Sequence, residues 1–458
     1  MAKQTDIRIT GTKVGFEDYL YRTPIKFGGR ALDRVTLVNV AVDAETGAGK
    51  RAAGFGSMTL GNVWAWPSAV LSYDQTLGAM KALAGEIARA MAGAAGEFGH
   101  PLDHGVALEE VAVEKSRAAA AGLPEAMPKL AALVVSSAFD AAIHDGFGKA
   151  NAIHSYQGYG KDYATCDLGR YLGAAFRGEF AARYVEERPK ESLALYHLVG
   201  ALDALAAADV TKPVGDGLPE TLYDWIKKDG LTHLKVKLNG DDLGWDIERV
   251  LAVNRVAEEA AQKLGARQWQ YSLDFNEKCR SVEYLLEFVA RLKEGSAAVF
   301  ERVQYIEQPT ARDLRANPAN RMHKAAAMKP VVIDESLVDH ESLLLAGEMG
   351  YSGVALKACK GITQSVLLAA AARKKGMFVC VQDLTCVGVS FLESAGLAAH
   401  IPGVTAVEGN GRQYCPAANR GWQERFPDTF APRQGRIRTG ALDGAGLGCV
   451  PEGYEGEW

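Results

Sequence analysis

The sequence predicts an α/β fold, a (β/α) barrel of the TIM type preceded by a smaller α+β unit. Six short apolar runs in the second half of the 458-residue chain each end in an ionisable residue, and successive ends lie 23 to 37 residues apart. These ends are Lys237, Asp274, Glu307, Asp334, Lys357 and Asp383. Helix-like runs such as residues 362–376 separate them. Each interval fits a strand, a helix and two loops, and parallel units of this kind close into a barrel whose site lies at the C-terminal strand ends.

Composition narrows the class of protein. A hydrophobic content of 48% supports a large core, and a net charge of −5 gives no general attraction to nucleic acid or anionic membranes. The N-terminus lacks a signal-peptide pattern, and no apolar run reaches the roughly 18 residues that a membrane span needs. Seven scattered cysteines without a C-x-x-C pair argue against a disulfide framework. We expect a cytoplasmic homo-oligomer that acts on a small molecule and binds neither nucleic acid nor membrane.

The first third of the chain has a different pattern from the barrel region. Residues 34–56 predict two strands joined by a glycine-containing turn, and the Ala-rich residues 72–99 predict a long helix. Residues 127–150 predict a second, strongly apolar helix. Residues 151–192 are aromatic and polar with irregular periodicity, so we interpret them as an insertion.

The barrel elements follow in order. Residues 192–200 predict the first strand, residues 221–230 a helix, and the second strand ends at Lys237. The eighth strand is predicted to end near Glu408, 25 residues after Asp383. After residue 415 the composition turns to Arg, Pro and Gly, and we expect no further barrel units there.

Three of the strand ends carry carboxylates on successive strands, at Asp274, Glu307 and Asp334. A hard divalent cation prefers such oxygen ligands, and without a cation the three charges would repel one another. Because side chains alternate along a strand, Lys235 shares a face with Lys237, and Asn276 shares one with Asp274. The pattern therefore predicts a metal site with basic groups beside it.

The lysines suggest proton transfer. Burial and nearby positive charge lower the pKa of a lysine, which suits Lys237 for the role of general base. A cation that binds a substrate carboxylate would stabilise the enediolate formed when the α-proton leaves. Lys357, four strands farther round the barrel, would approach from the opposite face. The sequence thus predicts Mg²⁺-type chemistry on a small carboxylic acid.

Five segments together resemble the enolase superfamily, most closely its muconate lactonizing enzyme-like branch in the mandelate racemase/muconate lactonizing enzyme family. They are KVKLNG (235–240), LDFNE (273–277), YIEQP (305–309), IDES (333–336) and LKACKG (356–361). The resemblance extends to FDAAIHDGFGKA (139–150), YRTPIKFGGR (21–30), which looks like a mobile loop of the family's capping domain, and GAGLG (444–448).

This resemblance implies a domain organisation. Residues 1–125 would form an α+β capping domain, and residues 126–150 a helix that leads into the barrel of residues 193–415. Residues 416–458 would return to the cap and complete it. Residues 151–192 are outside the resemblance and stay an insertion.

The resemblance also implies residue roles. Asp274, Glu307 and Asp334 would be the Mg²⁺ ligands, with Asn276 and Glu335 as nearby polar support.

Among the lysines, Lys237 would be the base and Lys235 its neighbour that contacts the substrate carboxylate and lowers the pKa of Lys237. Lys357 would be the acid or base on the other face. Asp383 departs from the usual muconate-type pattern, so either direct catalysis or an ion pair with a lysine fits it. Glu408 is a candidate substrate contact.

Several residues have simpler interpretations. A lone K-x-K is usually a solvated strand end, and Lys360 is best interpreted as a loop charge that contacts backbone or solvent. His144 is predicted to be a core histidine with a hydrogen-bond partner. Trp64 and Trp66 form either a cap loop that closes over the site or a packed aromatic corner.

We therefore expect an isomerase or lyase that abstracts a proton α to a carboxylate in an Mg²⁺-dependent way. The outcome can be racemisation or epimerisation, dehydration or cycloisomerisation, and the sequence does not choose among them. A non-catalytic barrel that binds metal and acid is the alternative. A metal-dependent hydrolase would usually need histidine ligands at the strand ends, which are missing.

Overall fold

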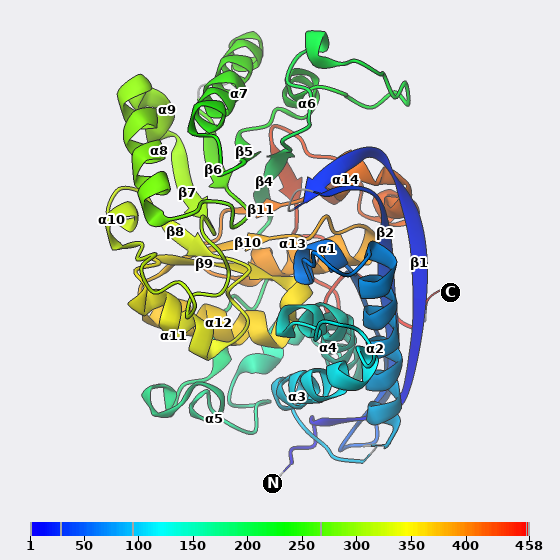
Figure 1. Cartoon of the computed structure of the whole chain (residues 1–458). Coiled ribbons are helices and arrows are strands. Elements are labelled where there is room, and N and C mark those ends of the chain that lie inside the picture. The colour runs from blue at the N-terminus through cyan, green and yellow to red at the C-terminus, as the bar shows by residue number, and fades with distance from the viewer. Residues whose placement is uncertain (1, 28–29, 94–95, 266–267, 455, 457–458) are drawn as a thin grey trace.

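Eight parallel strands close into a barrel in the second half of the chain, because the last of them pairs with the first. The computed structural model describes residues 2–27, 30–93, 96–265, 268–454 and 456. The strands are β4 (Ser192–Val199), β5 (His233–Lys237), β6 (Gln270–Asp274), β7 (Val303–Glu307), β8 (Val331–Ile333), β9 (Gly353–Lys357), β10 (Phe378–Gln382) and β11 (Ala406–Glu408). The predicted barrel is confirmed, including its first, second and eighth strands (Figure 1).

Helices connect consecutive strands on the outside of the barrel. They are α6 (Leu222–Asp229), α7 (Leu243–Leu264), α8 (Val282–Gly295), α9 (Ala297–Glu301), α10 (His323–Ala326), α11 (His340–Glu348), α12 (Ile362–Lys374) and α13 (Gly388–His400). Local sequence sets their ends. In α6, the Thr221 hydroxyl caps the first turn by accepting from the Asp224 amide at 3.1 Å, and Gly230 ends the helix in a left-handed conformation.

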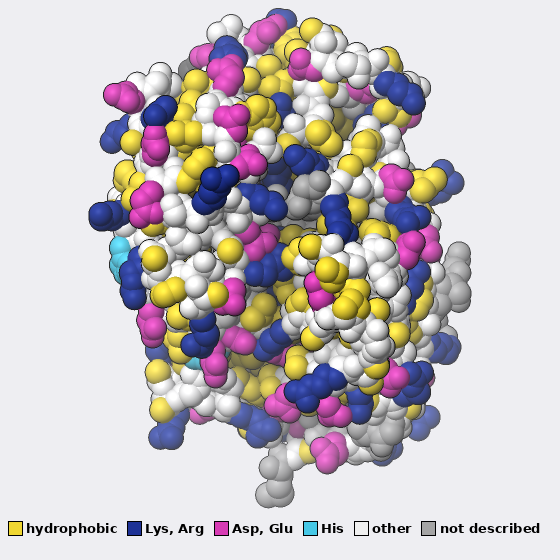
Figure 2. All heavy atoms as spheres, viewed as in Figure 1, with side chains coloured by type: hydrophobic (Ala, Val, Ile, Leu, Met, Phe, Trp, Pro, Cys, Tyr) yellow, Lys and Arg dark blue, Asp and Glu magenta, His cyan; other side chains and the backbone are white. Residues whose placement is uncertain are grey.

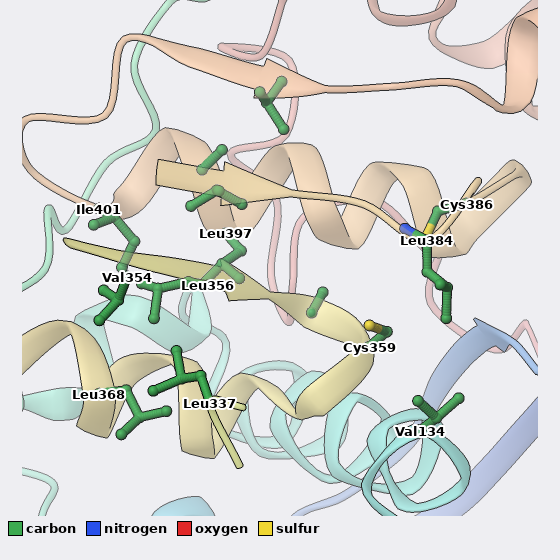
Figure 3. Close-up of a cluster of buried hydrophobic side chains, with 14 of the residues drawn as sticks. Val134, Leu337, Val354, Leu356, Cys359, Leu368, Leu384, Cys386, Leu397 and Ile401 are labelled. Atoms are coloured by element: carbon green, nitrogen blue, oxygen red, sulfur yellow. The ribbon is translucent and has the colours of Figure 1, made fainter. Parts of the chain in front are cut away.

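Two apolar layers hold the barrel together. Side chains that point inward fill its interior below the strand ends, among them Tyr196, Tyr305, Val332 and Cys380. A second layer lies between the strands and the outer helices. Figure 3 shows part of it, where Val354 and Leu356 of β9 lie near Leu368 of α12 and Leu397 of α13. Because side chains fill the interior, a small molecule in the barrel would bind at the end of the strands and not between them.

The N-terminal part forms an antiparallel sheet with helices beside the barrel (Figure 1). Its elements are β1 (Ile7–Phe27), β2 (Arg30–Thr46), β3 (Arg51–Thr59), α1 (Asn62–Ala65), α2 (Tyr73–Gly93), α3 (Pro101–Ala119) and α4 (Lys129–Asn151). Strand β3 lies directly on α4 at two glycines. A Cβ atom at Gly54 would be 2.1 Å from the carbonyl oxygen of Ala142, and one at Gly56 would be 2.1 Å from that of Ala138. Glycine is needed for this close approach.

We expect Gly56→Ala to lower the melting temperature. The added methyl group would overpack the contact with α4, which typically costs about 1–3 kcal/mol. Gly78→Ala is the matched control because Gly78 is a helical glycine with no atom within 4 Å of an added Cβ. This control should be neutral or stabilising by up to about 1 kcal/mol. Equal melting temperatures for the two variants would contradict the close contact.

Helix α4 is the core helix of the molecule. By length and composition it could cross a membrane, with a mean hydropathy of 1.3, but that window is completely buried inside the protein, as in the core helices of many globular folds. His144 in this helix is buried, with Thr363 Oγ1 2.8 Å from its Nε2 atom and Tyr159 OH 3.0 Å from its Nδ1 atom. The prediction of a hydrogen-bonded core histidine is confirmed.

Residues 151–192 form short helical turns against α4 and α12, namely η1 (Ser155–Tyr159), α5 (Gly169–Leu172), η2 (Ala174–Phe176) and η3 (Ala181–Arg183). The other 3₁₀ turns before the tail, within the described residues, are η4 (Ala207–Asp209) and η5 (Ala358–Lys360). All seven cysteines are free thiols, as the sequence predicted. The domain boundaries given above stay predictions.

The C-terminal segment does more than return to the cap. After α14 (Gly411–Tyr414), it contains η6 (Pro416–Asn419), α15 (Trp422–Arg425), α16 (Pro427–Phe430) and β12 (Arg436–Arg438). Strand β12 pairs antiparallel with β4, an addition to the barrel sheet that the sequence did not predict. Farther on, the Leu447 amide donates to Asp145 of α4 at 2.9 Å, and the Tyr454 ring packs edge-on against Phe55 of β3. The tail therefore joins the barrel to the cap.

Candidate active site

Strand register brings the predicted site residues to one end of the barrel. Lys237, Asp274 and Glu307 are direct neighbours at the ends of β5, β6 and β7. Asp334 follows β8 and Lys357 ends β9. The site contains six buried carboxyl groups and four buried ammonium groups. These are Asp274, Glu307, Asp334, Glu335, Asp383 and Glu408, with Lys235, Lys237, Lys357 and Lys360.

Lys235 is the central cation of the site. Its Nζ atom lies 2.9 Å from Glu307 Oε1, 2.9 Å from Glu408 Oε2 and 3.2 Å from Asp274 Oδ2. Burial disfavours the charged form, but these carboxylates outweigh burial and raise the pKa of Lys235 well above its usual value. Lys235 therefore stays charged and holds the acids in position, which makes it unsuited to act as a base.

Lys237 and Lys357 lie at opposite sides of the barrel mouth. The Lys237 ammonium donates to Asp274 Oδ2, and the Lys357 Nζ atom lies 2.8 Å from Asp334 Oδ2. Their strands are separated by four positions round the barrel. Both side chains line a cavity of only about 10 Å³, room for about one water molecule, together with Asp334, Asp383 and Glu408. A molecule bound there would have an ammonium group on each side.

The carboxyl groups divide into two kinds. Burial opposes ionisation of Asp274 and Asp334, but Lys237 and Lys235 outweigh it at Asp274, whose pKa is lowered. Lys357 and Lys360 likewise hold the pKa of Asp334 at about 2.

Two other carboxyl groups shift in the opposite direction. Burial and then the charge of Asp274 raise the pKa of Glu307 well above its usual value. Burial, with Asp334 and Glu277, raises the pKa of Glu335 to about 8. The site therefore has too little positive charge for all of its acids.

The chemistry of the donor set suits a divalent cation, although in the described residues no three of these groups are gathered closely enough to hold one ion together. Six carboxyl groups face four lysines, so a formal excess of two negative charges is buried if all are ionised. Oε2 of Glu335 is buried and has no hydrogen-bond partner in the described part of the chain. The ionisable donors are carboxylate oxygens, which a hard cation such as Mg²⁺ prefers. Asp274, Glu307 and Asp334 are the residues that would hold such an ion, with Glu335 next to Asp334.

The cap contributes Trp64 to the site. Its indole Nε1 atom donates to Glu335 Oε1 at 2.9 Å, and Lys357 Nζ lies 4.6 Å from the centroid of its ring. Such cation–π contacts favour the charged lysine. The structure therefore places Trp64 over the site, in agreement with the lid interpretation. Trp64 and Trp66 are both buried in the large apolar core, as the packed-corner interpretation predicts.

Asp383 makes no ion pair in the described residues, so that alternative is wrong. Instead it accepts from the amides of Cys386 and Asn410 at 3.2 and 3.1 Å and from the Asn410 side chain at 3.0 Å. The same Asn410 amide donates to Glu408 Oε1 at 2.6 Å. Burial, with the charge of Glu408, raises the pKa of Asp383 to about 7. Asn410 thus links two acids that would otherwise repel each other.

Lys360 contacts the backbone, one of the two contacts that the sequence suggested, but it is buried and also pairs with a site carboxylate. It lies in η5, is 3% exposed, and donates to the backbone carbonyl of Asp334 at 2.6 Å and to Asp334 Oδ1 at 3.1 Å. The short turn after β9 points it inward. Asn276 donates its backbone amide to Asp274 Oδ1 at 2.8 Å, while its side chain lines a second cavity beside Lys237.

Sequence reasoning missed two further site residues. Gln382 ends β10 and donates its amide to Glu307 Oε2, and Asn410 follows β11. The alternation of side chains along a strand could have indicated both, because residues two positions apart share a face. Gln382 is two residues after the inward-pointing Cys380, and Asn410 is two after Glu408. Charge at a strand end does not indicate these two residues, because both are neutral.

Comparisons with known proteins agree with this geometry. A family model described as Enolase C-terminal domain-like matches residues 218–454, more than half of the chain. No curated protein matches the chain.

Solved structures share the whole fold. A dipeptide epimerase from Enterococcus faecalis, solved with Mg and L-Leu-L-Tyr, is 15% identical with a TM-score of 0.61, covering 96% of this chain and 99% of that one. A muconate lactonizing enzyme from Pseudomonas fluorescens is 16% identical with a TM-score of 0.60, and the match covers 96% of each chain. An N-succinyl Arg/Lys racemase from Bacillus cereus is 17% identical with a TM-score of 0.61, and the match covers 96% of this chain and 95% of that one. At such low sequence identities these structures show that the fold is shared, and nothing beyond the fold. Together with the family model, this shared fold shows that the chain belongs to the mandelate racemase/muconate lactonizing enzyme family of the enolase superfamily.

Proposed function

We propose that this protein is an Mg²⁺-dependent enzyme that removes a proton α to the carboxylate of a small acid. The observation that carries this proposal is the placement of Lys237 and Lys357 on opposite sides of a buried mouth, with three carboxylates on the strands between them. The family membership and the Mg found in the related dipeptide epimerase support the choice of metal. A cytoplasmic location and a homo-oligomeric state stay predictions.

Each residue has a distinct task in this proposal. Asp274, Glu307 and Asp334 bind the cation, which when bound would stabilise the negative charge that develops on the substrate carboxylate. Lys235 stays protonated among its three acids and neutralises charge at the same place. Lys237 takes the α-proton on one face, as a general base within reach of the mouth cavity.

The second lysine decides which outcomes are possible. Lys357 faces the mouth from the other side, so it can return a proton to the opposite face of a planar intermediate. Proton return to that face gives racemisation or epimerisation, whereas loss of a leaving group gives dehydration. Trp64 shields Lys357 from the cap side and thereby keeps water away from this step.

We expect Lys357→Ala to separate the two faces. Proton exchange by Lys237 should continue, while inversion should fall by about 10²-fold or more because the second proton donor is lost. Exchange in D₂O is followed by mass spectrometry and inversion by chiral chromatography. Equal loss of both would argue against a mechanism with one lysine on each face.

The general test is α-proton exchange in D₂O against a pooled library of sugar acids, N-acyl amino acids, dipeptides and muconate-like acids. Each pool is run with Mg²⁺ and again with excess EDTA. Exchange that requires Mg²⁺ would support the proposal and identify the substrate class. If no pool exchanges, the protein is better explained as a non-catalytic barrel that binds metal and acid.

A further inference from the structure

A second cavity adjoins the mouth on the side of Lys237. It has a volume of about 190 Å³ and lies between the cap hairpin, the loop after β5 and the loop after β6. Its lining is Lys26, Ala201, Lys237, Leu238, Asn239, Asp241, Asn276 and Lys278. Lys237 lines both this cavity and the mouth. A molecule that reaches Lys237 therefore has its distal part in this vestibule.

The vestibule is lined with positive charge that the protein does not neutralise. Lys26 of β1 and Lys278 of the loop after β6 form no ion pair within the described residues. The one acid in the lining is the exposed Asp241. The side-chain amides of Asn239 and Asn276 have no hydrogen-bond partner within the same residues. Figure 2 shows Lys and Arg side chains around the hollow at the centre of this face.

The backbone holds this arrangement in place. Asn276 and Glu277 are two consecutive non-glycine residues with positive φ, 45° and 67°, a costly conformation that persists only where surrounding contacts fix it. Glu277 is fixed by Arg312, whose Nε and Nη2 atoms donate to its two oxygens at 2.8 and 2.6 Å. Glu277 is thus paired with Arg312 and does not line the vestibule, whereas its neighbours Asn276 and Lys278 do.

We propose that the vestibule binds a second, distal carboxylate of the substrate, so that the substrate is a dicarboxylic acid. This inference rests on the proposed function, because the first carboxylate is the one activated at the mouth. Lys26 and Lys278 supply charge, and the amides of Asn239 and Asn276 supply hydrogen-bond donors. A neutral polyol tail would leave both lysines without a partner, and a cationic tail would be repelled.

The test uses matched pairs in which only the distal charge changes. A 2-hydroxy diacid, a 2-acylamino diacid and an aminoacyl-glutamate are each compared with their ω-amides, which for the last is the aminoacyl-glutamine. A distal phosphonate analogue distinguishes a carboxylate from a general anion site. We expect kcat/KM for exchange to be at least about tenfold higher for the diacid, which corresponds to about 1.4 kcal/mol, and the preference to shrink as salt is raised.

Variants assign the preference to the vestibule. Lys26→Gln and Lys278→Gln should each reduce the diacid-to-amide ratio, and the double variant should bring it close to one. Lys375→Gln is the control, since this exposed lysine ends α12 at the opposite end of the barrel and lines neither cavity. It should keep the wild-type ratio. A ratio near one in the wild-type protein, or one that both variants preserve, would overturn the inference, as would a stronger response to the phosphonate than to the carboxylate.

Calorimetric binding of the same pairs separates this inference from the proposed function. If no compound exchanges its proton but the diacids bind more tightly through Lys26 and Lys278, the vestibule assignment stands and the catalytic proposal fails. If monoacids exchange as well as diacids, the catalytic proposal stands and the vestibule assignment fails. Equal binding of diacids and amides overturns the vestibule assignment in either case.

Discussion

We expect Lys237→Ala to slow α-proton exchange by about 10²–10⁴-fold, the usual contribution of a general base. The Nζ atom of Lys237 lines the mouth and donates to Asp274, so the substitution removes the amine that accepts the α-proton once it has lost its own proton. The Asp274 carboxylate keeps a partner, because Lys235 Nζ remains 3.2 Å from its Oδ2 atom. The metal-binding residues should therefore stay in place.

The measurement is exchange in D₂O under Mg²⁺ saturation, with Mg²⁺ affinity determined separately by calorimetry. Lys375→Ala serves as the control, since it also removes a lysine but at the other end of the barrel. Full exchange in Lys237→Ala would remove this lysine from the mechanism. A large loss of Mg²⁺ affinity would instead mean that Lys237 acts by holding Asp274.

The barrel and its charged strand ends could be predicted because both depend on local periodicity. Apolar runs at regular intervals indicate the strands, and a parallel sheet brings their C-terminal ends together, which is where Asp274 and Glu307 pair. Charge at the end of an apolar run is unusual enough to be read directly. Neutral partners such as Gln382 carry no comparable signal.

Contacts between distant segments could not be predicted. The hydrogen bond from Trp64 to Glu335 joins residues 271 positions apart and depends on how the cap lies on the barrel. The pairing of Lys360 with the Asp334 carboxylate could not be predicted, because three residues after a strand end usually means a loop, whereas a short 3₁₀ turn points it back to Asp334. The pairing of β12 with β4 likewise follows from the path of the tail over the surface of the barrel.

We expect Glu307→Gln to weaken Mg²⁺ binding by at least about tenfold, since even residues that only support metal ligands typically cost 10–100-fold. Glutamine has the same shape but no charge, so the variant removes one of the negative charges on which a cation site depends. The fold should tolerate the change. Lys235 would keep Glu408 and Asp274 as partners, and burial already disfavours the ionised form of Glu307.

The pKa of Glu307 is raised, whereas the pKa values of Asp274 and Asp334 are lowered. For this reason Glu307→Gln is more informative than replacing either aspartate by asparagine. Asp274 and Asp334 are held ionised by lysines, so neutralising either would leave a buried ammonium group with less compensation and would disturb the site even without metal. At Glu307 burial and the charge of Asp274 already oppose ionisation, so the substitution removes less compensation from the lysines. Calorimetric Mg²⁺ titration should therefore show weaker binding with an unchanged melting temperature for the metal-free protein, while Glu348→Gln, an exposed change at the end of α11, should alter neither. Unchanged Mg²⁺ affinity in Glu307→Gln would remove Glu307 from the ligand set.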